Sequence, residues 1–536
     1  WADKVRDIYA ELQAMARTDK KIGEFSTLPV CEKQLRSMAK RPDELPGRLN
    51  ELAQGQNSIA QYLADVLERL YYSPLAIDEI YVYQSEAVLP KNTNFFVRIW
   101  ESVKRFFLSF GAKAYDKTAA DNTENLQVWV ARSRQYVEII QKMADEKFAS
   151  GTGVDISLMP DPGKLVLANA AGDSPDVALG VNYALPYELA LRGALKDLHT
   201  FPDISEVEAR FKPGLVYPGR YNGGLFALPE TTNFLVLFYR TDILNNLNLT
   251  VPDTMQEVKN MLPQLNRQGM NFFTHMAGNI GYKPFSATLP FIYQNGGSLY
   301  GNTADDIRLN SEATIDALTE MTELFTIYGM PFEVRNFYQH FRSGLLPIGV
   351  SDFNTYNLLL NTAPEIANSW DIALYPGYKD EKGEVQRWTT GAAESCMIFE
   401  STEKPDFAWE FLKWWTAEDT QLRFAQTLQL TYGKEYMWNT SNVEAFKRLP
   451  WNKRHKEVIL EQLNWVVEAP RVPGNYMMER ELSNTVMSVV LDGKNPRAAI
   501  NESMRTVRSE IWRKLEEFGY MKNGEIVREY VIPPIT

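Results

Sequence analysis

Four polar residues stand between a glycine-containing stretch and a strongly apolar run in the middle of the sequence. The stretch NGGLFALPETTNFLVLFYRTDIL begins at Asn222, and the apolar run is Phe234–Tyr239. The polar quartet between them is Glu230, Thr231, Thr232 and Asn233. A carboxylate, two hydroxyls and an amide can donate and accept many hydrogen bonds. The run after them is apolar at every position, which predicts a strand buried on both faces. We therefore expect a polar loop that leads into a buried strand.

Residues suited to catalysis or metal binding lack the spacing that such chemistry needs. Cys31 and Cys396 lie far apart, and the 4 histidines show no zinc-type spacing. The sequence has no G-x-S-x-G, Walker loop, H-E-x-x-H or G-x-G-x-x-G motif. A glycoside hydrolase needs two carboxylates at a fixed separation, and no motif pairs the carboxylates of this acidic chain. We expect no cofactor, no metal site and no catalytic residue, with a carbohydrate-active enzyme as the alternative.

The composition excludes several classes of protein. With a net charge of −12 and a pI of about 5.2, the chain is a poor candidate for binding nucleic acid or anionic lipid. Its 536 residues are 45% hydrophobic and 12% aromatic, enough for several packed cores. No apolar run reaches the roughly 18 residues of a membrane-spanning helix. The chain begins with Trp-Ala-Asp-Lys and no signal peptide, so we expect a mature or trimmed chain whose targeting segment lies outside it.

Residues 1–123 form a region of their own, and we expect a mostly helical N-terminal extension. Apolar residues at spacings of three and four in VRDIYAELQAMA and SIAQYLADVLERLYYSP predict helices. A further segment, Phe96–Phe110, combines aromatic and basic residues. It is either a membrane-surface helix or a helix that docks on the following domain, and the acidic character of the chain favours docking.

Strands alternate with helices from about residue 124 onward. LQVWVAR, GVDISLMP and PDVALG are strand candidates separated by amphipathic helices, which predicts a parallel sheet covered by helices. The loops Met159–Asp161 and Gly180–Tyr183 then lie at the carboxyl edge of this sheet, where open α/β sheets bind ligands. A second α/β unit follows the strand Phe234–Tyr239. We assign 124–235 and 396–536 to a first α/β lobe with a C-terminal helical part, and 236–395 to a second lobe.

Several short motifs also occur in the order that one protein family shows. They are YNGGLFALPETTNFLVLFYRTDIL with VPDTMQEV, GDSPDVALG, ALRGALKDL, FIYQNGGSLYG, FRSGLLPIGVSDFNTY and EKPDFAWEFLKWW. Together they cover about three quarters of the chain and resemble the family 1 extracellular solute-binding proteins of ABC importers. Met255 and Phe226 depart from the Trp and Tyr usual in the family. Residues 1–123 resemble the extra region of its large Gram-positive members.

The resemblance implies a fold, a location and partners. The fold is α/β, a two-lobe periplasmic-binding-protein-like fold of type II, with hinge strands and a ligand cleft between the lobes. The implied function is capture of a carbohydrate, such as an oligosaccharide, for delivery to the permease subunits of an ABC transporter, without catalysis. We expect an extracellular monomer, anchored to the surface of a Gram-positive cell as a lipoprotein through a lipid outside the given chain.

Sugars need aromatic planes for their apolar faces and planar polar groups for their hydroxyls. Loop residues of these types give the candidate ligand-binding set: Asn182, Tyr183, Glu230, Thr231, Asn233, Asp352, Phe353, Tyr356, Trp388, Glu394, Tyr436, Trp438 and Tyr476. Some have a structural alternative, because Asp352 could cap a helix and Trp438 could pack a loop. Trp409, Phe411, Trp414 and Trp415 fall at helical spacing and are expected mostly in the core.

Overall fold

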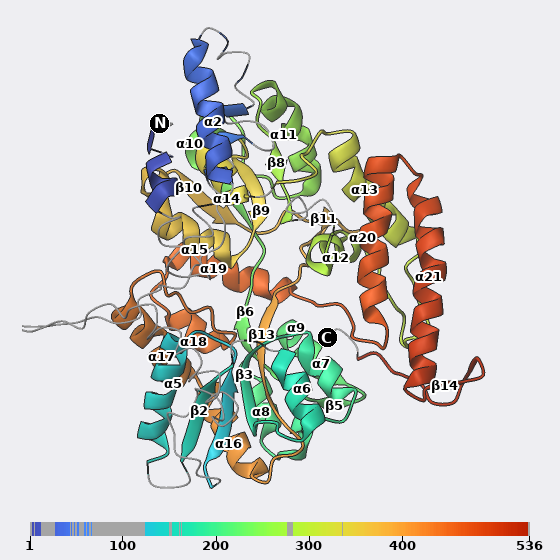
Figure 1. Cartoon of the computed structure of the whole chain (residues 1–536). Helices are drawn as coiled ribbons and strands as arrows, with labels where there is room; N and C mark the ends of the chain where they lie inside the picture. The colour runs from blue at the N-terminus through green and yellow to red at the C-terminus, as the bar shows by residue number, and fades with distance from the viewer. Residues whose placement is uncertain are drawn as a thin grey trace, which may run out of the picture. The chain divides into compact units, whose positions relative to one another are not determined.

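The computed structural model describes residues 124–533 except 150–152, 160, 162, 276–281 and 335, together with parts of residues 3–66. The chain divides into two compact units, residues 1–123 and 124–536 (Figure 1). The aromatic and basic segment Phe96–Phe110 lies outside the described residues, so its docking stays a prediction.

The N-terminal unit contains a helix with one buried face. Helix α2 (Thr27–Lys40) buries Leu28, Cys31 and Met38, and residues 6–11 are also helical. The buried side chains of α2 form a small hydrophobic cluster with Ile59 and Val66. This spacing of three to seven residues is that of one face of a helix, as a helical unit requires.

A five-stranded mixed sheet forms the core of the first lobe. Its order is β2-β1-β3-β13-β6. The strands are β1 (Leu126–Val130), β2 (Val154–Leu158), β3 (Val177–Asn182), β6 (Leu228–Thr232) and β13 (Ala392–Ile398). Strands β1, β2 and β3 are parallel, as predicted, whereas β13 runs antiparallel to both β3 and β6. The helices after the parallel strands are α5 (Arg134–Lys147), α6 (Gly163–Ala171) and α7 (Leu185–Ala190). The carboxyl ends of β1 and β3 therefore meet at one edge.

Three residues of the polar quartet, Glu230, Thr231 and Thr232, lie in a strand, so the prediction of a loop was wrong for them, whereas Asn233 follows that strand. Residues 228–232 form strand β6, whose five residues are all buried. Glycines 223 and 224 belong instead to a short hairpin formed by β4 (Arg220–Tyr221) and β5 (Gly224–Leu225). Strand β6 tolerates polar side chains because they hydrogen-bond inside the protein, as Thr232 Oγ1 does when it donates to the Gly391 carbonyl oxygen at 3.0 Å.

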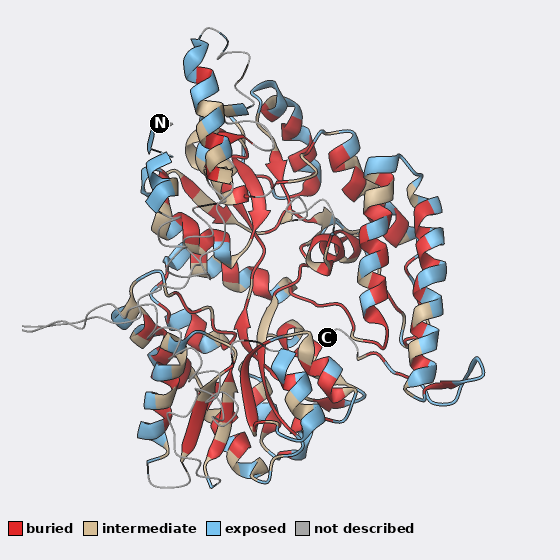
Figure 2. Ribbon diagram, in the orientation of Figure 1, coloured by how far each residue is buried: buried red, intermediate tan, exposed pale blue. Residues whose placement is uncertain are grey.

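The second lobe has a four-stranded sheet in the order β10-β7-β9-β8. Its strands are β7 (Val236–Arg240), β8 (Phe272–Phe273), β9 (Ile348–Ser351) and β10 (Trp370–Ala373). All five residues of strand β7 are buried; the first four are apolar, as predicted, and the fifth is Arg240. In Figure 2 buried residues colour the strands, whereas exposed residues gather on the outer sides of the helices. The helices of this lobe are α10 (Thr241–Asn246), α11 (Met255–Arg267), α12 (Phe285–Gln294), α13 (Glu312–Thr326), α14 (Phe337–Ser343) and α15 (Phe353–Thr362). Thr254 and Glu257 form a capping box that starts α11.

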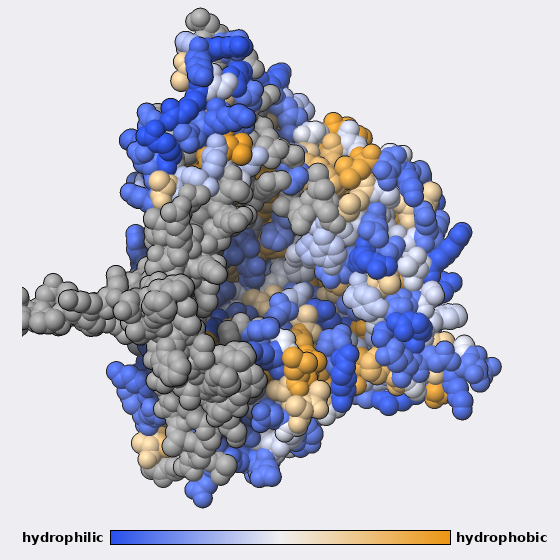
Figure 3. Space-filling model, viewed as in Figure 1, coloured by the Kyte–Doolittle hydropathy of each residue, from blue (hydrophilic) through white to orange (hydrophobic). Residues whose placement is uncertain are grey.

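The C-terminal helices divide between the two sheets. They are α16 (Pro405–Trp415), α17 (Glu418–Tyr432), α18 (Val443–Arg448), α19 (Lys453–Gln462), α20 (Asn475–Asp492) and α21 (Pro496–Glu517). Helix α16 packs on β13, whereas α20 and α21 contact α13 of the second lobe and share its hydrophobic cluster. Hydrophilic residues predominate at the right-hand edge of Figure 3, where Figure 1 places α21. The sequence assigns all of 396–536 to the first lobe, whereas α20 and α21 pack against the second lobe. The lobe boundaries themselves stay a prediction.

Three segments lie side by side where the chain passes between the sheets. Residues 233–235 connect β6 with β7, residues 387–391 lead from the hairpin of β11 (Tyr378–Lys379) and β12 (Val385–Gln386) into β13, and residues 465–467 pair with Thr389. The Asn233 amide donates to the Gly391 carbonyl oxygen at 2.7 Å, and the Val467 amide donates to the Thr389 carbonyl oxygen at 2.8 Å. The packing leaves no room for a side chain at Gly391.

Replacement of Gly391 by alanine is expected to destabilise the protein by about 1–3 kcal/mol, the usual cost of overpacking. A Cβ atom there would lie 2.8 Å from the Asn233 carbonyl oxygen and 2.8 Å from Val466 Cγ2. Calorimetric unfolding should show a lower Tm than wild type. Gly163→Ala is the control, because its Cβ would first meet the flexible Asp161 side chain at 3.1 Å. Equal Tm values for the two variants would contradict the tight packing.

Candidate functional site

Arg132 holds together a group of residues at the carboxyl edge of the first sheet. Its Nη2 atom lies 2.5 Å from Glu394 Oε2 and 3.5 Å from Glu230 Oε1. The guanidinium also lies over the Trp438 ring, 4.6 Å from the centroid, and Thr231 Oγ1 donates to Glu394 Oε2 at 2.8 Å. We call these five residues the Arg132 cluster. Four of them were candidates from the sequence, so the tertiary structure brings them together as expected.

The two carboxylates of the Arg132 cluster have different surroundings. Glu230 is buried, and burial raises its pKa even though Arg132 opposes the shift. Its oxygens accept hydrogen bonds from the Gly180 amide at 2.5 Å and from Trp415 Nε1 at 3.2 Å. The Glu394 side chain is 34% exposed. Glu230 is therefore occupied inside the protein, whereas Glu394 can reach a ligand.

A second polar group surrounds Glu468, in the connection between α19 and α20. Glu468 Oε1 accepts hydrogen bonds from the amides of Gly391 and Ala392, both at 2.8 Å. The Arg471 guanidinium lies over the Tyr183 ring, 5.0 Å from its centroid. The Glu468 carboxylate is the main cause that raises the pKa of Tyr183, and it also contributes to the raised pKa of Tyr293, which burial dominates.

We call Glu468, Arg471, Tyr183, Tyr293 and Gln294 the Glu468 cluster. Tyr183 follows β3 of the first lobe, whereas Tyr293 and Gln294 end α12 of the second. Within the described part of the chain, four buried atoms of this cluster have no hydrogen-bond partner. They are Glu468 Oε2, Arg471 Nε, Tyr293 Oη and Gln294 Oε1. Buried polar atoms are nearly always paired in folded proteins, so such a concentration suits a site that a polar ligand completes.

The two clusters adjoin along β13. The Tyr183 amide donates to the Ala393 carbonyl oxygen at 3.1 Å, and Glu394 pairs with Asn182 in the strand register. Asn182 is exposed, and its Oδ1 accepts a hydrogen bond from the Ala184 amide at 3.0 Å. Asn182, Tyr183 and Glu394 thus lie at one edge of the sheet, although residues 180–182 belong to β3 and not to the predicted loop.

Trp388 lies beside the Glu468 cluster. Gln294 Nε2 donates to its carbonyl oxygen at 2.8 Å, and its indole makes an edge contact with Trp465 at a centroid distance of 5.2 Å. Trp388 Nε1 donates to Gln386 Oε1 at 3.2 Å. The side chain is half-buried, between the hairpin and β13, so one part of the indole is open.

Four other candidates serve the start of α15. Asp352 caps this helix by accepting a hydrogen bond from the Thr355 amide at 3.2 Å, and Asn233 Oδ1 accepts one from the Phe353 amide at 3.1 Å. Phe353 stacks on Trp451, and Tyr356 is fully buried with its hydroxyl 3.0 Å from His455 Nδ1. These contacts are structural, so we leave the four residues out of the proposed site.

Trp438 of the Arg132 cluster and the last two candidates make further contacts. Trp438 is buried, and its Nε1 donates to Gln421 Oε1 at 2.8 Å, which fits the alternative that it packs a loop. Tyr436 is half-buried between Tyr136 and Tyr432. Tyr476 is 52% exposed on α20, and its hydroxyl donates to Glu510 of α21. None of these contacts joins the Glu468 cluster.

Sequence reasoning missed Glu468, Arg471, Tyr293, Gln294 and Arg132. One signal for the first two was available, because WVVEAPRVPG places a carboxylate and a guanidinium inside an apolar, proline-containing stretch. Such charges are rarely buried without a reason. Arg132 directly follows a predicted strand, and a residue in that position belongs at the ligand-binding edge.

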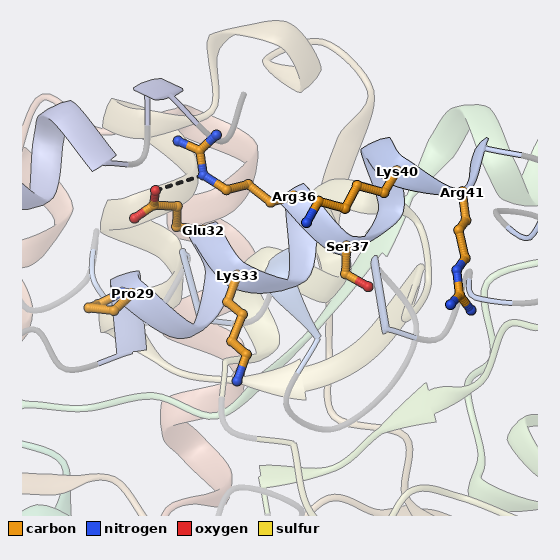
Figure 4. A pocket seen from close by; sticks show the side chains of 7 residues that line it. All are labelled: Pro29, Glu32, Lys33, Arg36, Ser37, Lys40 and Arg41. Carbon is orange, nitrogen blue, oxygen red and sulfur yellow. Dashed lines mark hydrogen bonds and ion pairs between the residues drawn. The ribbon is translucent and has the colours of Figure 1, made fainter.

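Helix α2 of the N-terminal unit carries a surface pocket of about 540 Å³ (Figure 4). Its lining includes Lys33, Arg36, Lys40 and Arg41. Arg36 pairs with Glu32 and Arg41 pairs with Glu44, all on exposed side chains or nearly so. Paired, solvated charges of this kind are typical of a helix surface, so the pocket carries no functional assignment.

The described residues contain no group of three or more His, Cys, Asp or Glu that could hold a metal ion. No helix among them has the length and hydropathy needed to cross a membrane.

Comparison with known proteins identifies the family. Residues 131–422, more than half of the chain, match the model of the bacterial extracellular solute-binding proteins, and residues 1–70 match the four-helix bundle domain of bacterial solute-binding proteins. A comparison with curated protein sequences found no match.

Solved structures of the same architecture are distant in sequence. The sugar-binding protein MalE from Xanthomonas citri is 20% identical, with a TM-score of 0.62 over 74% of this chain and 100% of that one. A solute-binding protein from Staphylococcus aureus in complex with maltose is 16% identical, with a TM-score of 0.60 over 75% and 100%. One from Thermotoga lettingae bound with α-D-tagatose is 18% identical, with a TM-score of 0.56 over 72% and 100%. The two-lobe fold predicted from the sequence is confirmed, and the chain belongs to the family of bacterial extracellular solute-binding proteins.

Proposed function

We propose that this protein captures a carbohydrate between its two lobes and delivers it to the permease of an ABC importer. The observation that carries the proposal is the Glu468 cluster, in which unpaired polar atoms from α12 and from the connection between α19 and α20 lie near Tyr183 of the first lobe. Several structurally similar proteins are described as binding maltose, maltotetraose or tagatose, which supports a sugar as the ligand.

The chemistry of the cluster also suits a sugar. Glu468 Oε2 and Gln294 Oε1 are acceptors, whereas Tyr293 Oη and Arg471 Nε are donors, so a ligand must both donate and accept hydrogen bonds. Hydroxyl groups do both. Trp388, Tyr183 and Tyr293 add aromatic rings on which a sugar face can pack. The proposed site therefore consists of the Glu468 cluster with Asn182, Trp388 and Glu394.

We further propose that the protein is not an enzyme and that it acts as a monomer at the cell surface of a Gram-positive bacterium, held by a lipid anchor. The surroundings of two carboxylates support the absence of catalysis. Glu230 is fully engaged and Glu394 is paired with Arg132, which leaves neither as a free nucleophile or base.

A panel of oligosaccharides tests the function. We expect at least one to raise the Tm of the purified protein, since a ligand that binds the native state stabilises it by mass action. The same mixtures, analysed by chromatography, should contain no products beyond the starting sugar. Product in excess of the protein concentration would show an enzyme instead, and an unchanged Tm with every sugar would contradict carbohydrate binding.

Lobe closure gives a second expected result. Because the segments between the sheets are short and hydrogen-bonded to one another, we expect the lobes to move as rigid bodies around the ligand. Small-angle scattering with a saturating sugar should show a smaller radius of gyration than the free protein. A constant radius, with binding confirmed by calorimetry, would argue against closure.

A further inference from the structure

Only one of the two carboxylate oxygens of Glu468 has hydrogen-bond partners. Its side chain is buried, at 1% exposure, and Oε1 takes both backbone donors, the amides of Gly391 and Ala392. The Tyr183 hydroxyl also hydrogen-bonds to the Glu468 carboxylate, which lowers the pKa of Glu468. Within the described residues Oε2 has no partner. A buried carboxylate oxygen in this state lacks the hydrogen bonds it would have in water.

The other groups around Glu468 come from three parts of the chain. Tyr183 extends from the end of β3, Arg471 from the same connection as Glu468, and Tyr293 from α12. The pKa values of both tyrosines are raised above the usual range, so their hydroxyls stay protonated at neutral pH. Arg471 supplies a fixed positive charge. Burial raises the pKa of Glu468 to about 7, partly offset by the two amides and by Arg471.

Gln294 provides a second acceptor, and its orientation is determined. Its Nε2 donates to the Trp388 carbonyl oxygen at 2.8 Å, so Oε1 is the atom that stays unpaired. A carbonyl oxygen cannot donate to Trp388, which excludes the flipped amide. The site therefore offers two acceptor atoms, one from the connection between α19 and α20 and one from the end of α12.

Two unpaired acceptor atoms favour a ligand that donates hydrogen bonds. Hydroxyls of a neutral sugar can donate to both atoms. A sugar carboxylate is only an acceptor at neutral pH, and beside Glu468 it would meet like charge. The Arg471 guanidinium lies over the Tyr183 ring.

We propose that Glu468 Oε2 and Gln294 Oε1 accept hydrogen bonds from hydroxyls of a neutral sugar residue, and that binding requires Glu468 to be ionised. This inference rests on the proposed carbohydrate-binding function and specifies the ligand at one position.

The direction of the pH dependence follows. Above the pKa of Glu468 the carboxylate is ionised and ligand affinity is at its full value. As the pH falls below about 7 the carboxylate takes up a proton, and the fraction of protein competent to bind declines. At 1.5 pH units below the pKa this fraction is about one thirtieth, so we expect affinity to fall by about tenfold to thirtyfold between pH 8 and pH 5.5.

Isothermal calorimetry at pH 8 and pH 5.5 tests the inference. The probes are maltotetraose, cellotetraose, xylotetraose and mannotetraose as neutral sugars, and tetragalacturonate as the acidic one. We expect the tightest binder to be neutral and to bind less tightly at pH 5.5. Glu468→Gln keeps an oxygen for the Gly391 and Ala392 amides but places a donor where Oε2 was. This variant should bind about tenfold more weakly at pH 8 and lose the pH dependence.

Two further variants distinguish the effect of Glu468 from effects that other substitutions would also have. Glu457→Gln makes the same chemical change on the exposed surface of α19 and should leave affinity and its pH dependence unchanged. Gln294→Met removes the second acceptor, so it should weaken binding at both pH values while keeping the ratio between them. The wild-type profile and Gln294→Met remain informative even if Glu468→Gln fails to fold.

The outcomes distinguish failure of the proposed carbohydrate function from failure of the proposed role of Glu468. If no probe binds at either pH, the proposed carbohydrate function fails, and the inference fails with it. If a sugar binds but its affinity is constant or rises on acidification, only the role of Glu468 is overturned. Tightest binding of tetragalacturonate, with Glu468→Gln unimpaired, would likewise overturn the preference for a neutral sugar.

Discussion

Replacement of Arg132 by methionine is expected to destabilise the protein by about 3–5 kcal/mol, the usual cost of removing one partner of a buried ion pair. Glu230 would stay buried beside Cys396 and Trp415 without its cation, because its side chain has no access to water. Glu394 is 34% exposed and can be hydrated, so most of the effect comes from Glu230. Calorimetry and chemical denaturation should both show the loss.

The pH dependence of this loss has a definite sign. Burial already raises the pKa of Glu230, and removal of Arg132 would raise it further. A group whose pKa is higher in the folded state contributes stability at low pH that is lost as the pH rises. The deficit of Arg132→Met should therefore be larger at pH 8 than at pH 5.

Two variants serve as controls for Arg132. Arg192→Met breaks an exposed pair with Glu188 on α7 and should cost no more than about 1 kcal/mol. The double variant Arg132→Met/Glu230→Gln should recover part of the stability, because the buried charge is gone. Equal stability of the single and double variants would contradict the proposed role of the Arg132–Glu230 pair.

The second large effect is expected for Trp388→Ala, which should weaken sugar binding about tenfold to a hundredfold. An indole that packs on a sugar face contributes roughly 1–3 kcal/mol, and ~1.4 kcal/mol corresponds to one decade of affinity. Trp388 is half-buried beside Gln294 and Trp465, at the boundary between the lobes. Titration calorimetry with the tightest sugar of the panel measures the change.

The fold should survive this substitution, because the indole is outside the hydrophobic clusters of both lobes. Trp512→Ala is the matched control, since Trp512 is 41% exposed on α21 and should not affect binding. If Trp388→Ala left affinity unchanged and lowered the stability of the free protein by several kcal/mol, Trp388 would be a packing residue. The proposed site would then lose its main aromatic surface.

Local patterns in the sequence were sufficient for much of the fold. The apolar run 234–239 predicted β7, because a strand buried on both faces needs apolar residues at every position. Helix α11 begins with a capping box of Thr254 and Glu257, two residues only three positions apart in the sequence. Trp409, Phe411, Trp414 and Trp415 were expected mostly in the core from their helical spacing; three are buried, whereas Trp414 is partly buried. These features depend on residues that are close together in the sequence.

The candidate site depended more on contacts between distant segments. The sequence left Asp352 as either a cap or a ligand contact, and the hydrogen bond from the Thr355 amide shows the cap. It predicted a loop for the polar quartet, because the glycines before it are typical of turns. Pairing with β13, more than 150 residues later, makes residues 228–232 a strand instead.

The sequence by itself determined the family, the α/β elements and several residues at the carboxyl edge of the first sheet. Only the tertiary structure showed that Glu468 accepts hydrogen bonds from Gly391 and Ala392, and that Tyr183 and Gln294 lie beside it. The physical reason is that helix and strand patterns record local burial, which neighbouring residues share. Whether a buried polar atom has a partner depends on which distant segments pack against it, and no local pattern contains that information.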